Sequence, residues 1–334
     1  MQRAALAALR RVITPGSRVA HVGYPDHWNA GDPAIWLGTQ HLLARLGCRV
    51  VYQCSWRDYD RGVMAACLGE GPVLIAGGGN LGDLWPNHQL FRERILEDFP
   101  HHRVVQMPQS WCFEDPSNLV RFKALANRHR DFHVFMRDAP GAEIASAALK
   151  APVTLCPDFS CGLGLLPRPA AALHAGIGLL RSDKEGGLAG VAMLPASVKR
   201  VDWIDFTDED APYQSAVGQL HQALADCHDR ARQRGADAAA VMTGIDALAT
   251  EIAWIRVRRG LRLLAQGDWV VTDRLHGYLL AEALGIPHFI LDNRNGKVRA
   301  YFDTWPSRSG LGTWLSSLEE LPGYLSAQGV KKHA

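Results

Sequence analysis

The sequence predicts an α/β protein in which two doubly wound, Rossmann-like domains face one cleft. Short apolar segments rich in β-branched residues alternate with helical segments along most of the chain, as is typical of parallel sheets covered by helices on both faces. With 334 residues the chain is too long for one ordinary core, so two domains are expected. A Gly-, Pro- and Ala-rich stretch at residues 163–175 interrupts the alternation. This stretch is the best candidate for the linker between the two domains.

The first predicted domain covers residues 1–165. Its opening segment, Met1 to Arg11, contains an Ala/Leu run of only six residues, which is too short for a signal peptide or a membrane span and fits a surface helix. A helix is expected over Asp32 to Leu46, since Pro33 lies in its first turn and Gly47 follows its end. The expected strands are Ser17 to Gly23, Val50 to Gln53, Val73 to Ala76, Val104 to Met107, His133 to Met136 and Val153 to Cys156.

The second predicted domain covers residues 176–305 and repeats the alternation. Its expected strands are Gly176 to Arg181, Gly190 to Leu194, Val201 to Asp205, Ala239 to Met242, Trp269 to Thr272 and Ile286 to Leu291. Its expected helices are Tyr213 to Arg234, Ile245 to Ala265 and Tyr278 to Leu284. Residues 306–334 are expected to form a C-terminal helix, Leu311 to Leu321, and a tail that pack back on the first domain.

Composition excludes several classes of function. The formal net charge of +2 is too small for non-specific binding to nucleic acid, so any anion site must be local. The seven cysteines are an odd number and form no C-x-x-C pair, so neither a disulfide framework nor a zinc site is indicated. The sequence therefore predicts a reduced, cytoplasmic protein.

The most informative motif is Asp273-Arg274-Leu275-His276-Gly277, which lies between a predicted strand and a predicted helix. The N-terminus of a helix favours an anion through its unpaired N–H groups and its dipole. Arginine offers a fork for phosphate or carboxylate, and histidine exchanges protons near neutral pH. The alternative is a capped helix whose Arg and His make only structural hydrogen bonds.

Two motifs in the first domain also follow strands. Asn29 and Asp32 lie in a polar loop at a helix start, where Asn29 is placed to donate to a ligand. Asp32 is either a helix cap or a base. The run from Gly77 to Gly79, followed by Asn80, lets backbone N–H groups approach a ligand. A tight turn is the alternative interpretation of this run.

Weaker signals accompany these motifs. Gln109 and Ser110 follow a predicted strand, and Arg181 is a second arginine at a strand end, with a surface salt-bridge cluster as its alternative. Asp208-Glu209-Asp210 has the form of a metal-binding motif but is interpreted as a helix start or solvated loop. Three loop tryptophans are suited either to stacking on a sugar or to packing in the core: Trp28, Trp85 and Trp111.

Taken in order, these motifs resemble those of the polysaccharide pyruvyl transferase family, and most of all its exopolysaccharide branch. The resemblance covers about residues 17–306 and rests on Asn29–Asp32, Gly77–Asn80, Pro108–Ser110, Arg137-Asp138, Arg181–Glu185, Asp273–His276, Asp292–Lys297 and Thr304-Trp305. Pro33 departs from the family pattern, in which a histidine or serine is common at that position. This departure weakens a catalytic role near that helix start but not the resemblance itself.

The resemblance implies a fold similar to the glycosyltransferase-B type and a donor, phosphoenolpyruvate, used as a co-substrate without a further cofactor or a metal. The implied acceptor is a terminal sugar of a bacterial polysaccharide or of a lipid-linked oligosaccharide, on which a pyruvate ketal is formed. The donor is expected to be bound by Arg181, Arg274, Leu275, His276 and Lys297. The acceptor is expected to be bound by Trp28, Asn29, Gly79, Asn80, Gln109 and Ser110.

Ketal formation requires an acid for the donor and a base for the sugar hydroxyls. His276 is expected to be the acid and Asp32 the base. A lipid-linked acceptor would bring the protein to the inner face of the cytoplasmic membrane. Two alternatives are a glycosyltransferase of the same build that uses a nucleotide sugar, and a non-catalytic polysaccharide-binding protein.

Overall fold

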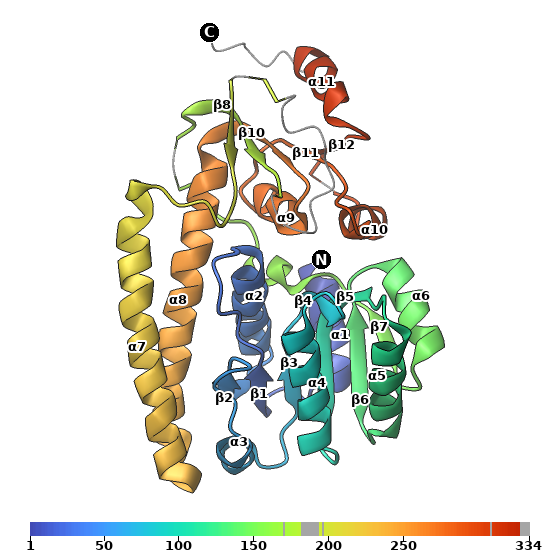
Figure 1. Cartoon of the computed structure of the whole chain (residues 1–334), viewed down its shortest axis with the longest axis vertical. Helices are drawn as coiled ribbons and strands as arrows, with labels where there is room; N and C mark the ends of the chain where they lie inside the picture. The colour runs from blue at the N-terminus through green and yellow to red at the C-terminus, as the bar shows by residue number, and fades with distance from the viewer. Residues whose placement is uncertain (170, 182–193, 196, 308, 328–334) are drawn as a thin grey trace. The chain divides into compact units, whose positions relative to one another are not determined.

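The computed structural model describes residues 1–169, 171–181, 194–195, 197–307 and 309–327, and it contains two compact units (Figure 1). The first unit comprises Met1–His27, Asp32–Gly162 and Ala211–Ile255. The second unit comprises Trp28–Gly31, Leu163–Asp210 and Arg256–Ala334. Each unit has its own parallel sheet, so the predicted α/β class with two Rossmann-like domains is confirmed.

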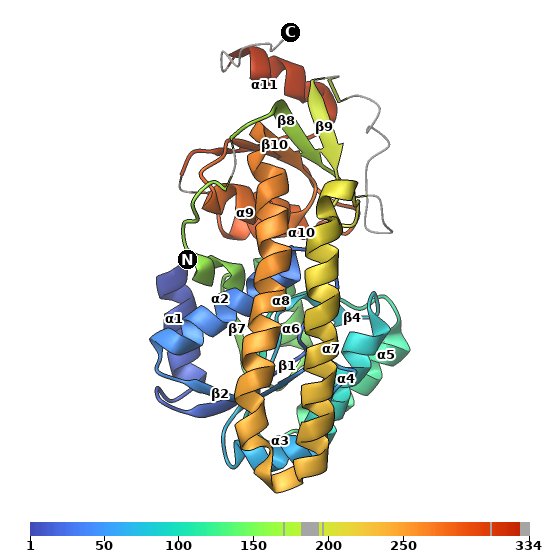
Figure 2. The ribbon, with the colours of Figure 1, turned by 90° about the vertical axis from the view of Figure 1, so that its left-hand side faces the viewer.

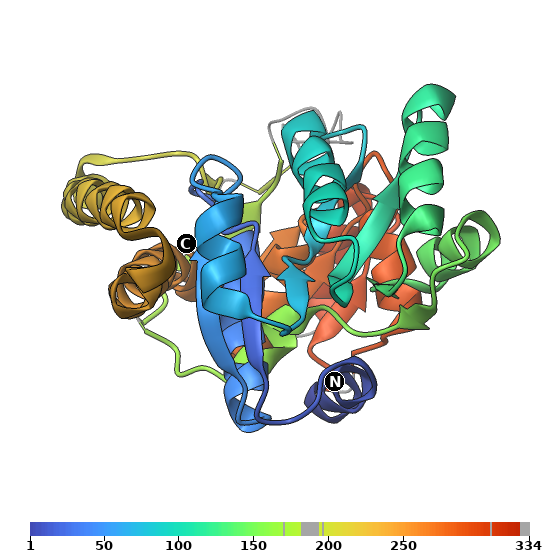
Figure 3. The ribbon, with the colours of Figure 1, turned by 90° about the horizontal axis from the view of Figure 1, so that it is seen from below.

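The first unit contains a seven-stranded sheet in the order β2-β1-β3-β5-β6-β7, with β4 paired to β5, and every described pairing is parallel. Its strands are β1 (Arg18–Val22), β2 (Arg49–Cys54), β3 (Val73–Ile75), β4 (Gly78–Gly82), β5 (Val104–Cys112), β6 (Phe132–Met136) and β7 (Val153–Leu155). Helices lie on both faces of this sheet (Figure 3). They are α1 (Gln2–Val12), α2 (Gly31–Arg45), α3 (Arg61–Leu68), α4 (Pro86–Asp98), α5 (Pro116–Arg128), α6 (Ala139–Ala148) and the short η1 (Phe159–Leu163).

Two long helices, α7 (Ala211–Arg234) and α8 (Ala239–Ala265), lie side by side (Figure 2). The short η4 (Gly235–Ala238) joins them. The strand predicted over Ala239 to Met242 was wrong, because these residues form the first turn of α8. A four-residue apolar run does not distinguish a strand from a buried helical turn.

One further strand of the first unit differs from the prediction. The strand predicted to end at Met107 continues to Cys112, with a register shift between Gln106 and Gln109. Pro108 lies in that shift, where its missing N–H costs no ladder hydrogen bond. Helix α1 is an amphipathic helix at the surface of the unit: one face is exposed, and the other is buried in the core together with residues of α2, β3 and β5.

The second unit contains a five-stranded parallel sheet in the order β12-β11-β10-β8-β9. Its strands are β8 (His174–Leu179), β9 (Val198–Val201), β10 (Gly267–Thr272), β11 (His288–Ile290) and β12 (Gly312–Trp314). Its helices are η3 (Asp208–Asp210), α9 (Leu275–Ala283), α10 (Lys297–Thr304), η5 (Leu318–Glu320) and α11 (Leu321–Ala327).

Three predicted elements of the second unit need comment. The strand expected over Val201 to Asp205 was misplaced, since β9 ends at Val201. The helix expected over Leu311 to Leu321 was wrong, since this segment contains β12 and η5 before α11 begins. Most of the strand expected over Gly190 to Leu194 lies outside the described residues.

The buried apolar residues form separate cores in the two units. Within the described part of the chain, no helix combines the length and the apolar character needed to span a membrane.

Candidate active site

Charged residues follow the C-terminal ends of four neighbouring strands in the second sheet. The strands are in register, with one row across the sheet formed by Val201, Leu179, Thr272 and Ile290. Beyond this row the chain leads to Asp202 after β9, Arg181 after β8, Arg274 after β10 and Lys297 after β11. Carboxyl ends of parallel strands are the usual location of ligands in doubly wound folds. Arg181 and Arg274 therefore follow neighbouring strands at the same edge, whereas Lys297 is the first residue of α10, after the loop that leaves β11.

Asp273 links two of these strands. Its Oδ1 accepts a hydrogen bond from the backbone N–H of Arg181 at 2.9 Å, which joins the chain leaving β8 to the chain leaving β10. Only 1% of Asp273 is exposed. Burial raises the pKa of its carboxyl to about 6, although the Arg181 N–H and the Arg274 charge act in the opposite direction. Sequence reasoning gave Asp273 no separate role.

Arg274 is held by a carboxylate that sequence reasoning missed. Its Nη2 donates to both oxygens of Asp202, at 2.6 and 2.7 Å, and both side chains are buried. Asp202 is itself fixed, since its Oδ1 accepts from the Trp203 N–H at 2.5 Å. By contrast, Arg274 Nε is buried and has no acceptor among the residues that the structure describes.

His276 is the second residue of α9, and Arg274 is the N-cap of this helix. Just before the helix, Thr272 Oγ1 accepts from the Arg274 N–H at 3.0 Å. A Cβ at Gly277 would lie 2.3 Å from Thr272 Oγ1, so only glycine lets α9 approach β10 this closely. Leu275, the first residue of α9, packs in an apolar cluster with Tyr278 and other residues.

The segment Trp28–Gly31 belongs to the second unit and lies against His276. A Cβ at Gly31 would be 2.3 Å from His276 Nδ1, so the imidazole ring packs directly on the Gly31 backbone. Asn29 Oδ1 accepts from the Gly31 N–H at 3.0 Å. Trp28 contacts Phe206 edge to face, with ring centroids 5.1 Å apart. Two residues from the expected acceptor set, Trp28 and Asn29, are thus in the same unit as the expected acid.

Asp32 belongs to the first unit, where it occupies the first turn of α2 rather than the cap position. Its Oδ2 lies 3.1 Å from His27 Nε2, and the two side chains are 28% and 39% exposed. The carboxylate therefore has a histidine partner that sequence reasoning did not identify.

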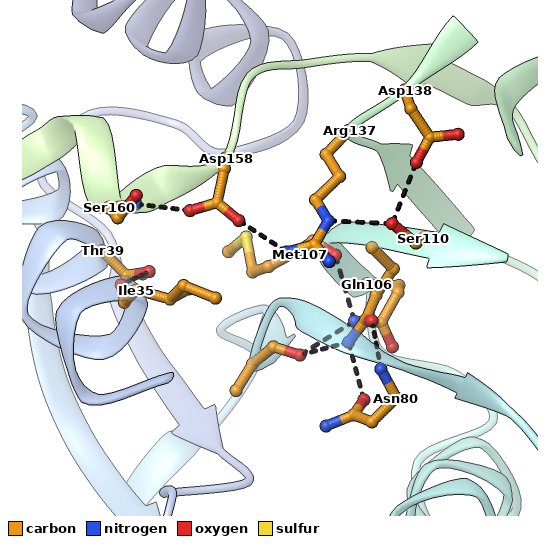
Figure 4. Close-up of polar contacts among 12 residues, drawn as sticks. Ile35, Thr39, Asn80, Gln106, Met107, Ser110, Arg137, Asp138, Asp158 and Ser160 are labelled. Carbon is orange, nitrogen blue, oxygen red and sulfur yellow. Dashed lines mark hydrogen bonds and ion pairs between the residues drawn. The ribbon is translucent and has the colours of Figure 1, made fainter. Parts of the chain in front are cut away.

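Asn80 in β4 and Gln109 in β5 form a polar network between these two paired strands, and Asn80 is labelled in Figure 4. Gln109 Nε2 donates to Asn80 Oδ1 at 2.8 Å and to the Ala76 carbonyl at 3.2 Å, while Gln109 Oε1 accepts from the Asn80 N–H. Arg92 Nη2 donates to the same Asn80 oxygen at 2.9 Å. The N–H groups of the Gln109 amide are therefore used within the protein.

The glycine run before Asn80 serves close packing as well as a turn. A Cβ at Gly77 would lie 2.7 Å from the Pro108 carbonyl oxygen, and Gly78 has a φ of +138°. Both positions consequently require glycine, and Gly79 lies between them and Asn80 in β4.

Ser110 belongs to a second network of hydrogen bonds, which is also drawn in Figure 4. Its hydroxyl donates to Asp138 Oδ2 at 2.9 Å and accepts from Arg137 Nε at 2.9 Å. Arg137 also forms a buried ion pair with Asp158 at 2.8 Å. This network ties together the chain segments that follow β6 and β7, so Ser110 and Arg137 have structural roles at this edge.

The remaining residues from the sequence analysis are placed as follows. Asp208–Asp210 form the short η3 directly before α7, as the interpretation of a helix start predicted, and Asp210 forms a buried ion pair with Arg259 at 2.8 Å. Trp111 packs against Phe113 and Phe122, whereas Trp85 is 40% exposed. Ser182 to Glu185, which follow Arg181 in its motif, lie outside the described residues.

Comparison with known proteins identifies relatives of this chain. Pyruvyl transferase 1 of Schizosaccharomyces pombe is 29% identical over 311 residues, which cover 86% of this chain and 69% of that protein. A Bacillus subtilis protein named "Putative pyruvyl transferase EpsO" is 27% identical over 331 residues, which cover 96% of each chain. General stress protein 30 of Bacillus subtilis is 21% identical over 292 residues, 85% of this chain and 76% of that protein.

A solved structure shares the fold. The crystal structure of a functionally uncharacterized protein from Klebsiella pneumoniae matches with a TM-score of 0.59 and 17% identity, over 93% of this chain and 97% of that one. The model of the family described as polysaccharide pyruvyl transferase matches residues 29–295. Because this match includes most of both units, the chain belongs to the polysaccharide pyruvyl transferase family and is an enzyme of that family, which implies a pyruvyl donor and a polysaccharide acceptor.

Proposed function

We propose that this enzyme transfers pyruvate from phosphoenolpyruvate to a sugar of a bacterial exopolysaccharide or of its lipid-linked repeat unit. The products are a cyclic pyruvate ketal and inorganic phosphate. The observation that carries the proposal is the C-terminal edge of the second sheet, where Arg181 follows β8, Arg274 follows the neighbouring β10, and His276 lies in the first turn of α9. A small donor with a phosphate and a carboxylate suits an edge of this kind.

Phosphoenolpyruvate is a polyanion, and this edge of the sheet offers the hydrogen-bond donors that a polyanion needs. Arginine guanidinium groups bind phosphate and carboxylate by charge-assisted hydrogen bonds. Helix α9 is nine residues long. Its N-terminus adds backbone N–H groups and the positive end of the helix dipole. Arg274 Nε, buried without an acceptor among the described residues, gains an acceptor when an anion binds.

The reaction requires proton transfers at two places. Protonation of the methylene carbon makes the central carbon of the donor electrophilic, and a sugar hydroxyl adds to that carbon. The C–O bond to phosphate then breaks, and a second hydroxyl of the same sugar closes the ketal ring and releases its proton. The cationic groups at the sheet edge offset the charge on the departing phosphate.

We assign the acid to His276 and the base to Asp32. His276 lies two residues after Arg274, the N-cap of α9, and is 9% exposed, so it is suited to give a proton to a donor bound at the helix start. Asp32, paired with His27, is suited to accept a proton from a sugar hydroxyl. Trp28, a partly exposed residue, is the aromatic residue that we assign to contact with a pyranose.

The decisive experiment measures phosphate released from phosphoenolpyruvate in the presence of a panel of terminal glycosides. Galactosides, glucosides and mannosides should be tested both free and lipid-linked. Release that depends on one glycoside, with a ketal in the product, supports the proposal. A thermal shift with nucleotide sugars and none with phosphoenolpyruvate would favour a glycosyltransferase instead.

Replacing His276 with alanine tests the acid. Ketal formation should fall by a factor of about 100 to 10,000, the usual contribution of general acid catalysis, while the donor still raises the melting temperature. His174→Ala is the matched control and should leave turnover unchanged. His174 is the first residue of β8, at the end of this strand opposite to the one that Arg181 follows. Wild-type turnover in His276→Ala would remove His276 from the mechanism.

A further inference from the structure

Asp202 lies outside every motif that marks the family in this sequence, yet it is one of the most completely buried carboxylates at the sheet edge, with 2% exposure. It directly follows β9, on the far side of β8 from β10. Both of its oxygens accept hydrogen bonds from a single nitrogen of Arg274. We propose that Asp202 is a positioning residue, which sets the orientation of the Arg274 guanidinium for an anionic donor.

The geometry determines which part of the guanidinium is left for a ligand. A guanidinium is planar and has five N–H donors in a fixed arrangement. Asp202 engages Nη2 at 2.6 and 2.7 Å, so the remaining donors are those of Nε and Nη1. Nε is buried and has no acceptor among the described residues. An unmet buried donor costs free energy, and an anion at this position would satisfy it.

Asp202 is rigid enough to act in this way. Its Oδ1 also accepts from the Trp203 N–H at 2.5 Å, and Trp203 is almost completely buried at 1% exposure. The Trp203 carbonyl in turn accepts from Arg259 Nη1 at 2.6 Å, and Arg259 is paired with Asp210. The segment after β9 is thus fixed from both sides, and it holds the Asp202 carboxylate in one place.

Charge alone gives the opposite expectation. Asp202 adds a negative charge to an edge that, under the proposed function, must attract a polyanion. If only net charge mattered, removing this carboxylate would tighten donor binding. If orientation matters, removing it would weaken donor binding even though the edge becomes more positive. The sign of the effect therefore distinguishes the two explanations.

The first test compares Asp202→Asn with Asp205→Asn. Asp205 is an exposed carboxylate three residues along the same segment, so the control changes the net charge equally. For Asp202→Asn we expect the KM for phosphoenolpyruvate to rise by a factor on the order of 10 to 100, with a smaller fall in kcat and a reduced donor-induced rise in melting temperature. For Asp205→Asn we expect all three to stay near wild type. An unchanged or lower KM in Asp202→Asn would overturn the inference.

Two further variants separate positioning from a general role in folding. In an Arg274→Ala background, Asp202→Asn should add no further change in donor KM, because the residue acts only through Arg274. The double variant also leaves no unpaired buried charge, so it should fold even if the single variant does not. Asp202→Glu keeps the charge but displaces the carboxylate, and it should also raise the donor KM. Full additivity in the double variant would overturn the inference.

This inference rests on the proposed function, and the two can fail separately. A wild-type enzyme that neither releases phosphate from phosphoenolpyruvate nor is stabilised by it contradicts the proposed function and the inference together. A wild-type enzyme that responds to the donor, with an Asp202→Asn variant that responds equally, contradicts the inference alone.

Discussion

Gly31 shows how one residue in the first half of the chain controls a side chain in the second half. A Cβ at this position would lie 2.3 Å from Nδ1, 2.5 Å from Cγ and 2.7 Å from Cβ of His276. Because the clash includes the His276 Cβ, rotation of the ring does not relieve it. In Gly31→Ala we expect kcat to fall by a factor on the order of 100, since a displacement of about 1 Å has this effect on catalytic groups.

The matched control is Gly218→Ala, in the middle of α7, where an added Cβ meets no atom within 4 Å. This variant should keep wild-type kcat and gain about 0.5 to 1 kcal/mol of stability, because alanine is the better helix former. Steady-state kinetics of both variants at saturating donor supply the comparison. Wild-type kcat in Gly31→Ala would show that the ring position at His276 does not limit turnover.

Asp273 is expected to make stability depend on pH. Its pKa in the folded state, about 6, lies above the ordinary value of 3.8 because of burial. The stabilising contribution of the protonated carboxyl is therefore complete below the unfolded pKa and is lost as the pH rises through 6. A difference of this size between the two pKa values corresponds to about 3 kcal/mol.

Asp273→Asn removes this titration while keeping an acceptor for the Arg181 N–H. The free energy of unfolding of the wild type, minus that of the variant, should fall by about 3 kcal/mol between pH 4 and pH 8. Denaturant titrations at several pH values measure this difference. Asp268→Asn, at an exposed position of β10, is the control and should follow the wild type at each pH. A difference that stays constant with pH would contradict the assigned pKa.

At the residue scale, the sequence indicated Arg181, Arg274 and His276 because each follows a predicted strand. Asp202 was missed because the strand was predicted to run from Val201 to Asp205, which placed this carboxylate inside it. In the structure β9 ends at Val201, so Asp202 is the first residue beyond it. A pairing between residues 72 positions apart leaves no local pattern from which it can be read.

At the element scale, α1 shows how one face of a surface helix contributes to the core. Its Ala/Leu face is buried in the core of the first unit, and Leu9 is 0% exposed. Leu9→Ala should therefore reduce the free energy of unfolding by about 2 to 5 kcal/mol, the usual cost of a large-to-small change in a core. Leu165→Ala, at a position that is 87% exposed, should change it by less than about 0.5 kcal/mol. Equal effects in urea denaturation would show that α1 does not belong to the core.

The strand ends of the first sheet show why element type was easier to predict than element length. Apolar runs located β1, β3 and β6 to within two residues. β5 was predicted too short because its apolar run ends at Met107, whereas the strand continues through Pro108 at a register shift. As a result, Gln109 and Ser110 lie within a strand, and their hydrogen bonds to Asn80 and Asp138 depend on cross-strand contacts that no local pattern reports.

At the scale of the whole molecule, the units are not two successive halves of the chain. Residues Ala211–Ile255, which lie between segments of the second unit, belong to the first. Their attachment to that unit is specific: Tyr24 Oη donates to the Ala249 carbonyl at 3.1 Å, and His221 Nε2 lies 3.3 Å from Asp26. Sequence periodicity identifies such helices but does not show which sheet they cover.

This arrangement leads to a prediction about fragments. Residues 1–165, the first domain as expected from the sequence, lack the segment Ala211–Ile255 and its buried residues Ile245 and Ile252. We expect this fragment to bind a hydrophobic dye and to unfold without a sharp transition, because apolar surface that α7 and α8 cover in the full chain is exposed. Circular dichroism and dye fluorescence measure both properties.

Supplying the missing segment in trans is the control for that fragment. A peptide of residues 211–255, mixed with residues 1–165, should restore a cooperative transition and displace the dye, because the contacts of Tyr24 and Asp26 can then form. A peptide with Ile245 and Ile252 replaced by alanine should restore less, as its buried apolar surface is smaller. If residues 1–165 alone unfold as sharply as the full chain, the helical pair is not part of the first folding unit, and the linker near residues 163–175 is a true domain boundary.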